Sequence, residues 1–176
     1  MSIEIITGLY LGDAEAAKQR VNHHVAVVSL FPVEKLADNV LHRLAIEIDD
    51  LPTANLLRHF PTIIDFIDQH RADCGVLVHC YAGSSRAVAC IVAYLIAKSL
   101  VKSVEEGLEL IIEKNGWHNV NEGFEEQLHL WASMGSCLDV QNNAYKRFQL
   151  KMLQETLLLE EESAGQIASI TQVGPR

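Results

Sequence analysis

The stretch of sequence best suited to chemistry runs from His79 to Arg86 and reads HCYAGSSR. It follows a short apolar run, GVLV, and leads into a longer apolar segment that begins at Ala87. A buried strand that ends in a glycine-containing loop before a helix directs free N–H groups and the positive end of the helix dipole toward a bound anion. We therefore predict a phosphate-binding loop formed by Tyr81, Ala82, Gly83, Ser84, Ser85 and Arg86.

Cys80 is the candidate nucleophile of this loop. Helix-start amides and a nearby arginine stabilise a thiolate over a thiol, and a guanidinium can hold two phosphate oxygens in a planar fork. The alternative is a structural cysteine with an arginine nearby by chance, because the C-x5-R spacing alone is common. The preceding His79, the central Gly83, the strand and the helix together favour a reactive cysteine. Cys74 and Cys90 flank these elements, and we interpret them as packing residues rather than redox partners.

The elements that must position this loop alternate between strands and helices along the chain. Continuous apolar runs rich in β-branched residues predict buried strands, and apolar positions repeated every three to four residues predict helices. The expected strands cover residues 3–12 (a pair broken at Gly8), 25–31, 44–48 and 75–78, and the expected helices cover 56–69, 87–100, 104–114, 122–134 and 143–162. This order predicts an α/β fold with a mostly parallel central sheet of about five strands flanked by helices.

A single catalytic domain is expected over residues 1–140, because a chain of 176 residues can bury a core that folds without disulfides. Residues 141–162 are expected to form a C-terminal amphipathic helix, and residues 163–176 a flexible tail. Tyr145, Phe148 and Met152 give that helix an apolar face. This face either packs on its own domain or contacts a protein partner.

The charge and hydropathy of the chain argue against several classes of partner. With 14 Lys+Arg and 23 Asp+Glu, the formal net charge is −9, which disfavours nucleic acid and anionic membrane surfaces. The longest strongly apolar stretch, Ala87 to Ala97, is shorter than the ~20 residues of a membrane span. The N-terminus has no secretory signal pattern, and four cysteines are too few for a disulfide framework. We therefore expect a cytoplasmic or nuclear protein.

Several segments besides the loop resemble the dual-specificity branch of the cysteine-dependent protein phosphatases. The matching landmarks are GLYLG, IDDLP before an apolar helix, GVLVHC and NEGFEEQL, and they cover residues 3–135. NEGF and the later AYKRFQLKM resemble most the atypical subgroup whose members normally carry a C-terminal zinc-binding domain, which is absent from this sequence. The resemblance implies a protein tyrosine phosphatase-like fold.

The resemblance also implies a two-step hydrolysis of phosphomonoesters. Cys80 would form a phosphocysteine, and Arg86 would stabilise the phosphoryl oxygens. The general acid of the family stands on a loop ahead of the cysteine, a position that Asp50 matches best and its neighbour Asp49 rivals. Local sequence alone would make Asp50 a helix-leading cap or a solvated loop charge.

Two further residues take supporting roles in this resemblance. His79 would support the loop and tune the thiolate, although a core histidine bonded to the backbone would occupy nearly the same state. Asn121 would tie the helix that follows it to the phosphate loop, whereas the local sequence makes it a helix N-cap. Ala87 departs from the family, which usually has Ser or Thr there. Members with Ala, such as the regenerating-liver phosphatases, are slow, so we expect weak turnover and a long-lived phosphoenzyme.

The predicted function is a phosphoprotein phosphatase that acts on phosphotyrosine and phosphoserine or phosphothreonine without a metal or another cofactor. His23 and His24 lack a cysteine or carboxylate at ligand spacing, so no metal site is predicted. Residues 81–85 contain no Lys or Arg, which favours a protein substrate over a lipid, and the acidic charge disfavours RNA. The alternative class is a pseudophosphatase that binds phosphoproteins with little turnover.

Overall fold

The computed structural model describes residues 2–19 and 26–171, with side chains as far as Leu158. The chain divides into two compact units, Met1–Leu138 and Asp139–Arg176. The division lies close to residue 140, where the sequence analysis ends the catalytic domain.

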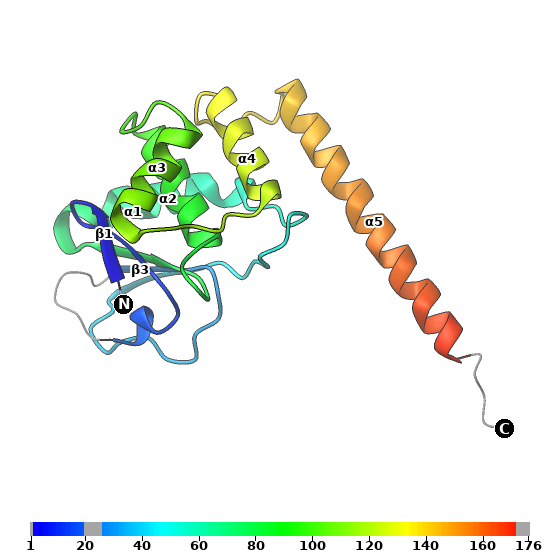
Figure 1. Ribbon diagram of the computed structural model, residues 1–176, viewed down its shortest axis with the longest axis horizontal. Helices are drawn as coiled ribbons and strands as arrows, with labels where there is room; N and C mark the ends of the chain where they lie inside the picture. The colour runs from blue at the N-terminus through cyan, green and yellow to red at the C-terminus, as the bar shows by residue number, and fades with distance from the viewer. Residues whose placement is uncertain (1, 20–25, 172–176) are drawn as a thin grey trace. The chain divides into compact units, whose positions relative to one another are not determined.

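The first unit is built on one five-stranded sheet (Figure 1). Its strands are β1 (Ser2–Ile6), β2 (Leu9–Gly12), β3 (Ala26–Ser29), β4 (His42–Ala45) and β5 (Val76–His79), arranged in the order β1-β2-β5-β3-β4. β1 pairs with β2 antiparallel, and the other three pairings are parallel. The mostly parallel α/β sheet predicted from the sequence is therefore confirmed.

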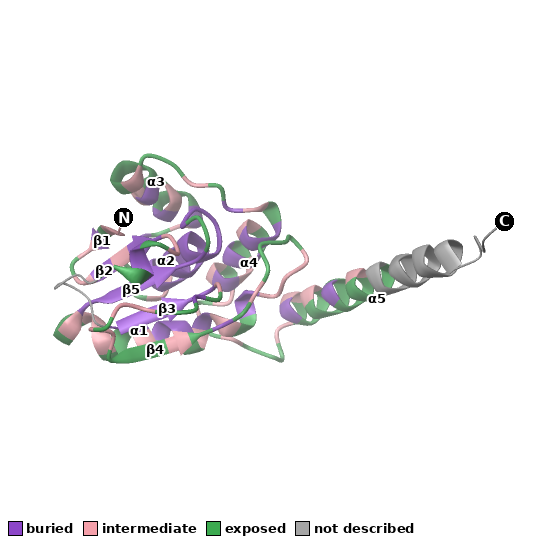
Figure 2. Ribbon diagram, turned by 90° about the horizontal axis from the view of Figure 1, so that it is seen from below, coloured by how far each residue is buried: buried purple, intermediate pink, exposed green. Residues whose placement is uncertain are grey.

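β3 and β5 form the centre of the sheet and are buried along their whole length (Figure 2). One face of the sheet is covered by a short 3-10 helix, η1 (Ala16–Lys18), through a cluster of Ala16, Ala17, Val27 and Leu77. Because side chains alternate along a strand, the residues next to Val27 and Leu77 point to the opposite face. There α1 (Phe60–Cys74) and α2 (Arg86–Ala97) pack side by side against the sheet.

Two elements are displaced from their predicted positions. β4 lies at residues 42–45 rather than 44–48, because its register places His42 opposite Ala26 and Ala45 opposite Ser29. The N–H of Ile46 still donates to the carbonyl of Ser29 at 2.9 Å, and residues 47–50 then form a loop. A 3-10 turn, η2 (Leu57–His59), precedes α1, which begins at Phe60 with Pro61 in its first turn, where the missing N–H of a proline costs nothing.

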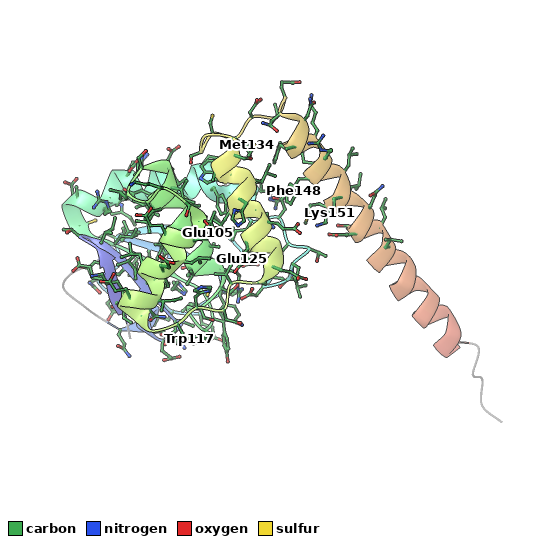
Figure 3. The ribbon with its side chains drawn as sticks, turned by 45° about the horizontal axis from the view of Figure 1, so that its top comes forward. Glu105, Trp117, Glu125, Met134, Phe148 and Lys151 are labelled. Carbon is green, nitrogen blue, oxygen red and sulfur yellow. The ribbon has the colours of Figure 1, made fainter. Side chains whose placement is uncertain are left out.

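Two outer helices cover α2. α3 (Val104–Asn115) is capped at its start by Ser103, whose Oγ accepts from the N–H of Glu106 at 3.2 Å. α4 (Glu122–Ser133) packs beside it, and Figure 3 labels Glu105 on α3 and Glu125 on α4. Residues 86–95 of α2 are buried throughout, as their apolar sequence predicts.

The second unit contains one long helix, α5 (Asn143–Thr171). Asn142 begins it, since its Oδ1 accepts from the N–H of Ala144 at 2.8 Å. The helix continues beyond Glu162, so residues 163–171 of the expected tail are helical; this stretch contains no proline and one glycine. The last five residues of the expected tail lie outside the described residues. In the part of the chain that the structure describes, no helix is both long and apolar enough for a membrane span.

Candidate active site

Cys80 lies directly after β5, at the carboxyl end of the central strand, and is 1% exposed. The loop that follows it bends at Gly83, whose φ is +71° and where an added Cβ would lie 2.7 Å from the carbonyl oxygen of Gly12. Only glycine fits this combination of backbone angle and close approach. The loop is therefore held against the end of β2 while it turns into α2.

The backbone of the loop is bonded through its carbonyl groups, while its N–H groups are left free. The carbonyl of Tyr81 accepts from Ala14 N–H at 3.1 Å, and that of Ser84 accepts from Asn119 N–H at 2.8 Å. Within the described structure, no protein acceptor pairs with the N–H groups of residues 82–86. A run of unpaired N–H groups at a helix start is suited to an anion.

Arg86 begins α2 and is 8% exposed. Its Nη1 donates to the carbonyls of Leu30 at 3.1 Å and Ile48 at 2.9 Å, and its guanidinium lies 5.7 Å from the ring centre of Phe31. The Nε atom is buried and makes no hydrogen bond, although it lies 3.5 Å from Oδ2 of Asp50. A buried donor without an acceptor is rare in folded proteins and indicates a site that a ligand completes.

Asp50 is the carboxylate that the structure joins to the loop. Its Oδ1 accepts from Ser85 Oγ at 2.6 Å and from Asn121 Nδ2 at 2.9 Å. Its side chain is 35% exposed, so it is accessible from the solvent side of the loop. Asp49, the alternative acid, lines the same cleft, but the contacts with Ser85 and Arg86 belong to Asp50.

His79 is buried beneath the loop. Its Nδ1 lies 3.2 Å from the carbonyl oxygen of Cys80, which can only accept, so Nδ1 carries the hydrogen. Nε2 then accepts from Ser29 Oγ at 2.9 Å. Burial lowers the pKa of His79, with the charge of Arg43 acting in the same direction. A neutral histidine thus braces the Cys80 backbone.

Asn121 has a different partner from the one the sequence analysis assigns to it. It does cap α4, because its Oδ1 accepts from Phe124 N–H at 2.9 Å. Its Nδ2, however, reaches Asp50 rather than the phosphate loop, and the backbone of Asn119 makes the contact to the loop instead. The reason is the path of the segment before α4, which brings Asn119 to Ser84 and leaves the side chain of Asn121 facing the loop that follows β4.

The comparison of this sequence with known protein families gives the same family as the resemblance of its motifs. The family model described as "Dual specificity phosphatase, catalytic domain" matches residues 9–134. The chain belongs to the dual specificity phosphatase family.

The chain is similar to curated proteins of this family and to solved structures. Human dual specificity protein phosphatase 12 is 35% identical over 163 residues, covering 87% of this chain and 48% of that protein. The Yvh1 phosphatase domain from Chaetomium thermophilum is 30% identical with a TM-score of 0.70, covering 79% of this chain and 99% of that chain. The crystal structure of DUSP15 is 28% identical with a TM-score of 0.71, and the match covers 77% of this chain and 89% of that chain. The chain spans less than half the length of the first curated relatives that it matches.

In this dual specificity phosphatase domain, Arg86 and Asp50 border a cleft of about 460 Å³. Its lining consists of Phe31, Pro32, Glu47, Ile48, Asp49, Asp50 and Arg86. Sequence analysis missed Phe31 and also Ser29, the partner of His79. Both stand at or just after the carboxyl end of β3, the strand next to β5, and that position is the signal that could have found them.

The remaining described cysteines and histidines are separate from the phosphate loop in their contacts. Cys90 is completely buried, and burial, with a smaller effect from the charge of Cys80, raises its pKa well above the usual value. Cys74 bonds the carbonyl of His70, and Cys137 is exposed. Among the side chains that the structure describes, in residues 2–19 and 26–158, no group of three His, Cys, Asp or Glu is arranged to hold a metal ion. His23 and His24 lie outside the described residues.

Proposed function

We propose that this chain hydrolyses phosphate monoesters on proteins, at phosphotyrosine and at phosphoserine or phosphothreonine, through a phosphocysteine on Cys80. The observation that carries the proposal is the set of unpaired donors next to this thiol. In the described structure the N–H groups of residues 82–86 have no protein acceptor, and the buried Nε of Arg86 makes no hydrogen bond and has only the 3.5 Å ion pair with Asp50. Together they can bind the oxygens of a phosphoryl group, whose charge they stabilise during transfer.

The first step transfers the phosphoryl group to the enzyme. The Cys80 thiolate attacks phosphorus, the S–P bond forms as the bond from phosphorus to the leaving oxygen breaks, and protonated Asp50 gives its proton to that oxygen. In the second step a water loses a proton to Asp50 and attacks phosphorus. The S–P bond then breaks, and inorganic phosphate and the thiolate are released.

The charge of the cleft supports a protein substrate over a polyanion. Glu47, Asp49 and Asp50 all line it, and the chain carries a net charge of −9. Additional phosphates next to the reacting group would be repelled by these carboxylates. A phosphoinositide or an RNA 5′ end is therefore a poorer candidate than a single phosphate on a peptide.

The test compares the wild-type protein with Cys80→Ser and Asp50→Ala on a phosphotyrosine peptide, a phosphothreonine peptide and a phosphoinositide. Cys137→Ser and Asp49→Ala are the matched controls, because they change the same residue types outside the proposed chemistry. We expect Cys80→Ser to abolish hydrolysis and Asp50→Ala to lower kcat by about 10²–10⁴. Wild-type hydrolysis no faster than that of Cys80→Ser would overturn the proposal.

One observation favours a second candidate, a phosphoprotein-binding module with little turnover. Ala87, buried at the start of α2, puts a methyl group where the family usually has a hydroxyl. Rapid quenching of the wild-type reaction separates the two functions. A full burst of phosphoenzyme followed by slow release indicates a slow enzyme, whereas tight phosphopeptide binding without phosphoenzyme indicates a binding module.

A further inference from the structure

Asp50 is held from two separate elements of the fold. Ser85 belongs to the phosphate loop and Asn121 to the start of α4, and both donate to the same atom, Oδ1 of Asp50. The other oxygen, Oδ2, faces Nε of Arg86 at 3.5 Å. The two oxygens of this carboxyl group therefore have different environments.

We propose that Ser85 and Asn121 are positioning residues for the general acid, and that they direct the transferable proton of Asp50 onto Oδ2. An oxygen that accepts two hydrogen bonds at 2.6 and 2.9 Å is a poor place for a proton. Protonation of Oδ2 leaves both bonds intact and puts the acidic hydrogen on the side of Arg86, where the phosphoryl group binds. The inference rests on the proposed function, since it concerns the acid of that reaction.

The backbone around Asp50 is docked onto the same helix that carries Asn121. Gln127 of α4 accepts from the N–H groups of Leu56 and Leu57, both at 2.8 Å, and donates to the carbonyl of Ala54 at 2.9 Å. An added Cβ at Gly123 would lie 2.1 Å from the carbonyl oxygen of Pro52. The acid loop is thus in close contact with α4, and the bond from Asn121 transmits that placement to the carboxyl group.

The side chain of Asn121 performs two tasks with different atoms, which makes them separable. Oδ1 caps α4 through Phe124 N–H, and Nδ2 holds Asp50. Serine is a comparable N-cap but has no group that replaces the amide N–H donor. Asn121→Ser therefore removes the contact with Asp50 and keeps the cap, and Ser85→Ala removes the other donor while leaving the loop N–H groups in place.

The experiment measures kcat/KM for aryl phosphates whose leaving groups range from nitrophenol to phenol. A good leaving group departs without a proton, so nitrophenyl phosphate reports binding and nucleophilic attack, whereas phenyl phosphate also reports the acid. We expect Asn121→Ser and Ser85→Ala each to lower kcat/KM for phenyl phosphate by about tenfold and to lower kcat/KM for nitrophenyl phosphate much less. In an Asp50→Asn background, neither change should lower kcat/KM for phenyl phosphate further.

The controls separate this inference from the proposed function. Asn142→Ser changes the equivalent cap of α5 and should leave both substrates unaffected. Equal losses on all leaving groups, or a further loss in the Asp50→Asn background, would overturn the positioning role while Cys80-dependent activity persists. Activity that does not depend on Cys80 would overturn the proposed function itself. If Asn121→Ser unfolds, Ser85→Ala decides the question alone.

Discussion

At the scale of single residues, different atoms of one side chain have different roles in this site. Arg86 uses Nη1 to bind two backbone carbonyls and keeps Nε free of hydrogen bonds. Asn121 uses one amide atom for a helix cap and the other for Asp50. A lysine could not replace Arg86, because an ammonium group is a compact point charge and cannot present two parallel N–H donors in one plane as a guanidinium does.

Ala87→Ser should raise steady-state turnover. The added hydroxyl would stand at the start of α2, directly after Arg86, and would stabilise the thiolate that leaves in the second step. We expect a higher kcat and a smaller burst of phosphoenzyme on an aryl phosphate, measured by rapid quenching. Ala89→Ser, also in α2, is the matched control. An unchanged kcat with Ala87→Ser would remove this explanation for slow turnover.

His79 should make the free energy of unfolding depend on pH. Burial lowers its pKa in the folded protein, so on acidification the unfolded chain takes up a proton before the folded one does. The contribution of His79 to stability is complete above the unfolded pKa of about 6.5 and falls as the pH drops below it. Urea titrations of wild type and His79→Gln should therefore give a stability difference that narrows from pH 7 to pH 5; a constant difference would contradict the assignment.

At the scale of elements, α4 supports the loop that carries Asp50. Gln127 is completely buried and bonds three backbone groups of the segment that follows Asp50, although it lies some seventy residues away in the sequence. The loop itself begins where β4 leaves the sheet edge, after its last pairing at Ala45. Asp50 is therefore placed by α4 and by the end of edge strand β4 together, and Cys80 belongs to neither element.

Gly123→Ala should lower both stability and activity. Its Cβ would meet backbone atoms of Pro52, which cannot rotate away as a side chain could. We expect a loss of about 1–3 kcal/mol in the free energy of unfolding and a larger loss of kcat on phenyl phosphate than on nitrophenyl phosphate. Gly135→Ala, just after α4, is the control, because its added Cβ would have no atom within 4 Å. It should change the free energy of unfolding and leave the ratio of kcat on the two substrates unchanged. A Gly123→Ala protein with full activity on both substrates would contradict the close docking.

At the scale of the whole molecule, the net charge of −9 coexists with the proposed phosphate-binding loop. The positive potential is local, since it comes from loop N–H groups, the start of α2 and Arg86. Three acidic residues, Glu47, Asp49 and Asp50, line the cleft beside Arg86. Attraction between phosphate and protein is therefore short-range, and solution salt should affect substrate capture little.

A chain that ends after Leu138 should fold and keep the proposed activity. The sheet, the phosphate loop and α4 all lie in the first unit, and α5 belongs to the second. We expect kcat/KM on an aryl phosphate to stay within about twofold of the full chain. The measurement is a comparison of the two chains, with thermal unfolding as a check on folding. Loss of activity in a folded truncated chain would show that α5 contributes to the site.

The sequence by itself determined the features that are local along the chain. The strand, the cysteine, the turn at Gly83, the arginine and the helix are consecutive, so residues 75–97 predict their own local structure and lead to the proposal of a phosphate-binding loop. The alternation of strands and helices likewise sufficed for the sheet and its mostly parallel pairing. Asp50 was the best-placed candidate acid, but local sequence could not separate it from Asp49.

Only the tertiary structure decided which distant side chains meet. Asn121 and Ser85 lie 71 and 35 residues from Asp50, and Ser29 lies 50 residues from His79. These contacts depend on the order of strands in the sheet and on how α4 docks against the loop after β4, which no local pattern encodes. A single side chain can satisfy its hydrogen bonds in many ways, and packing of the whole unit selects one of them.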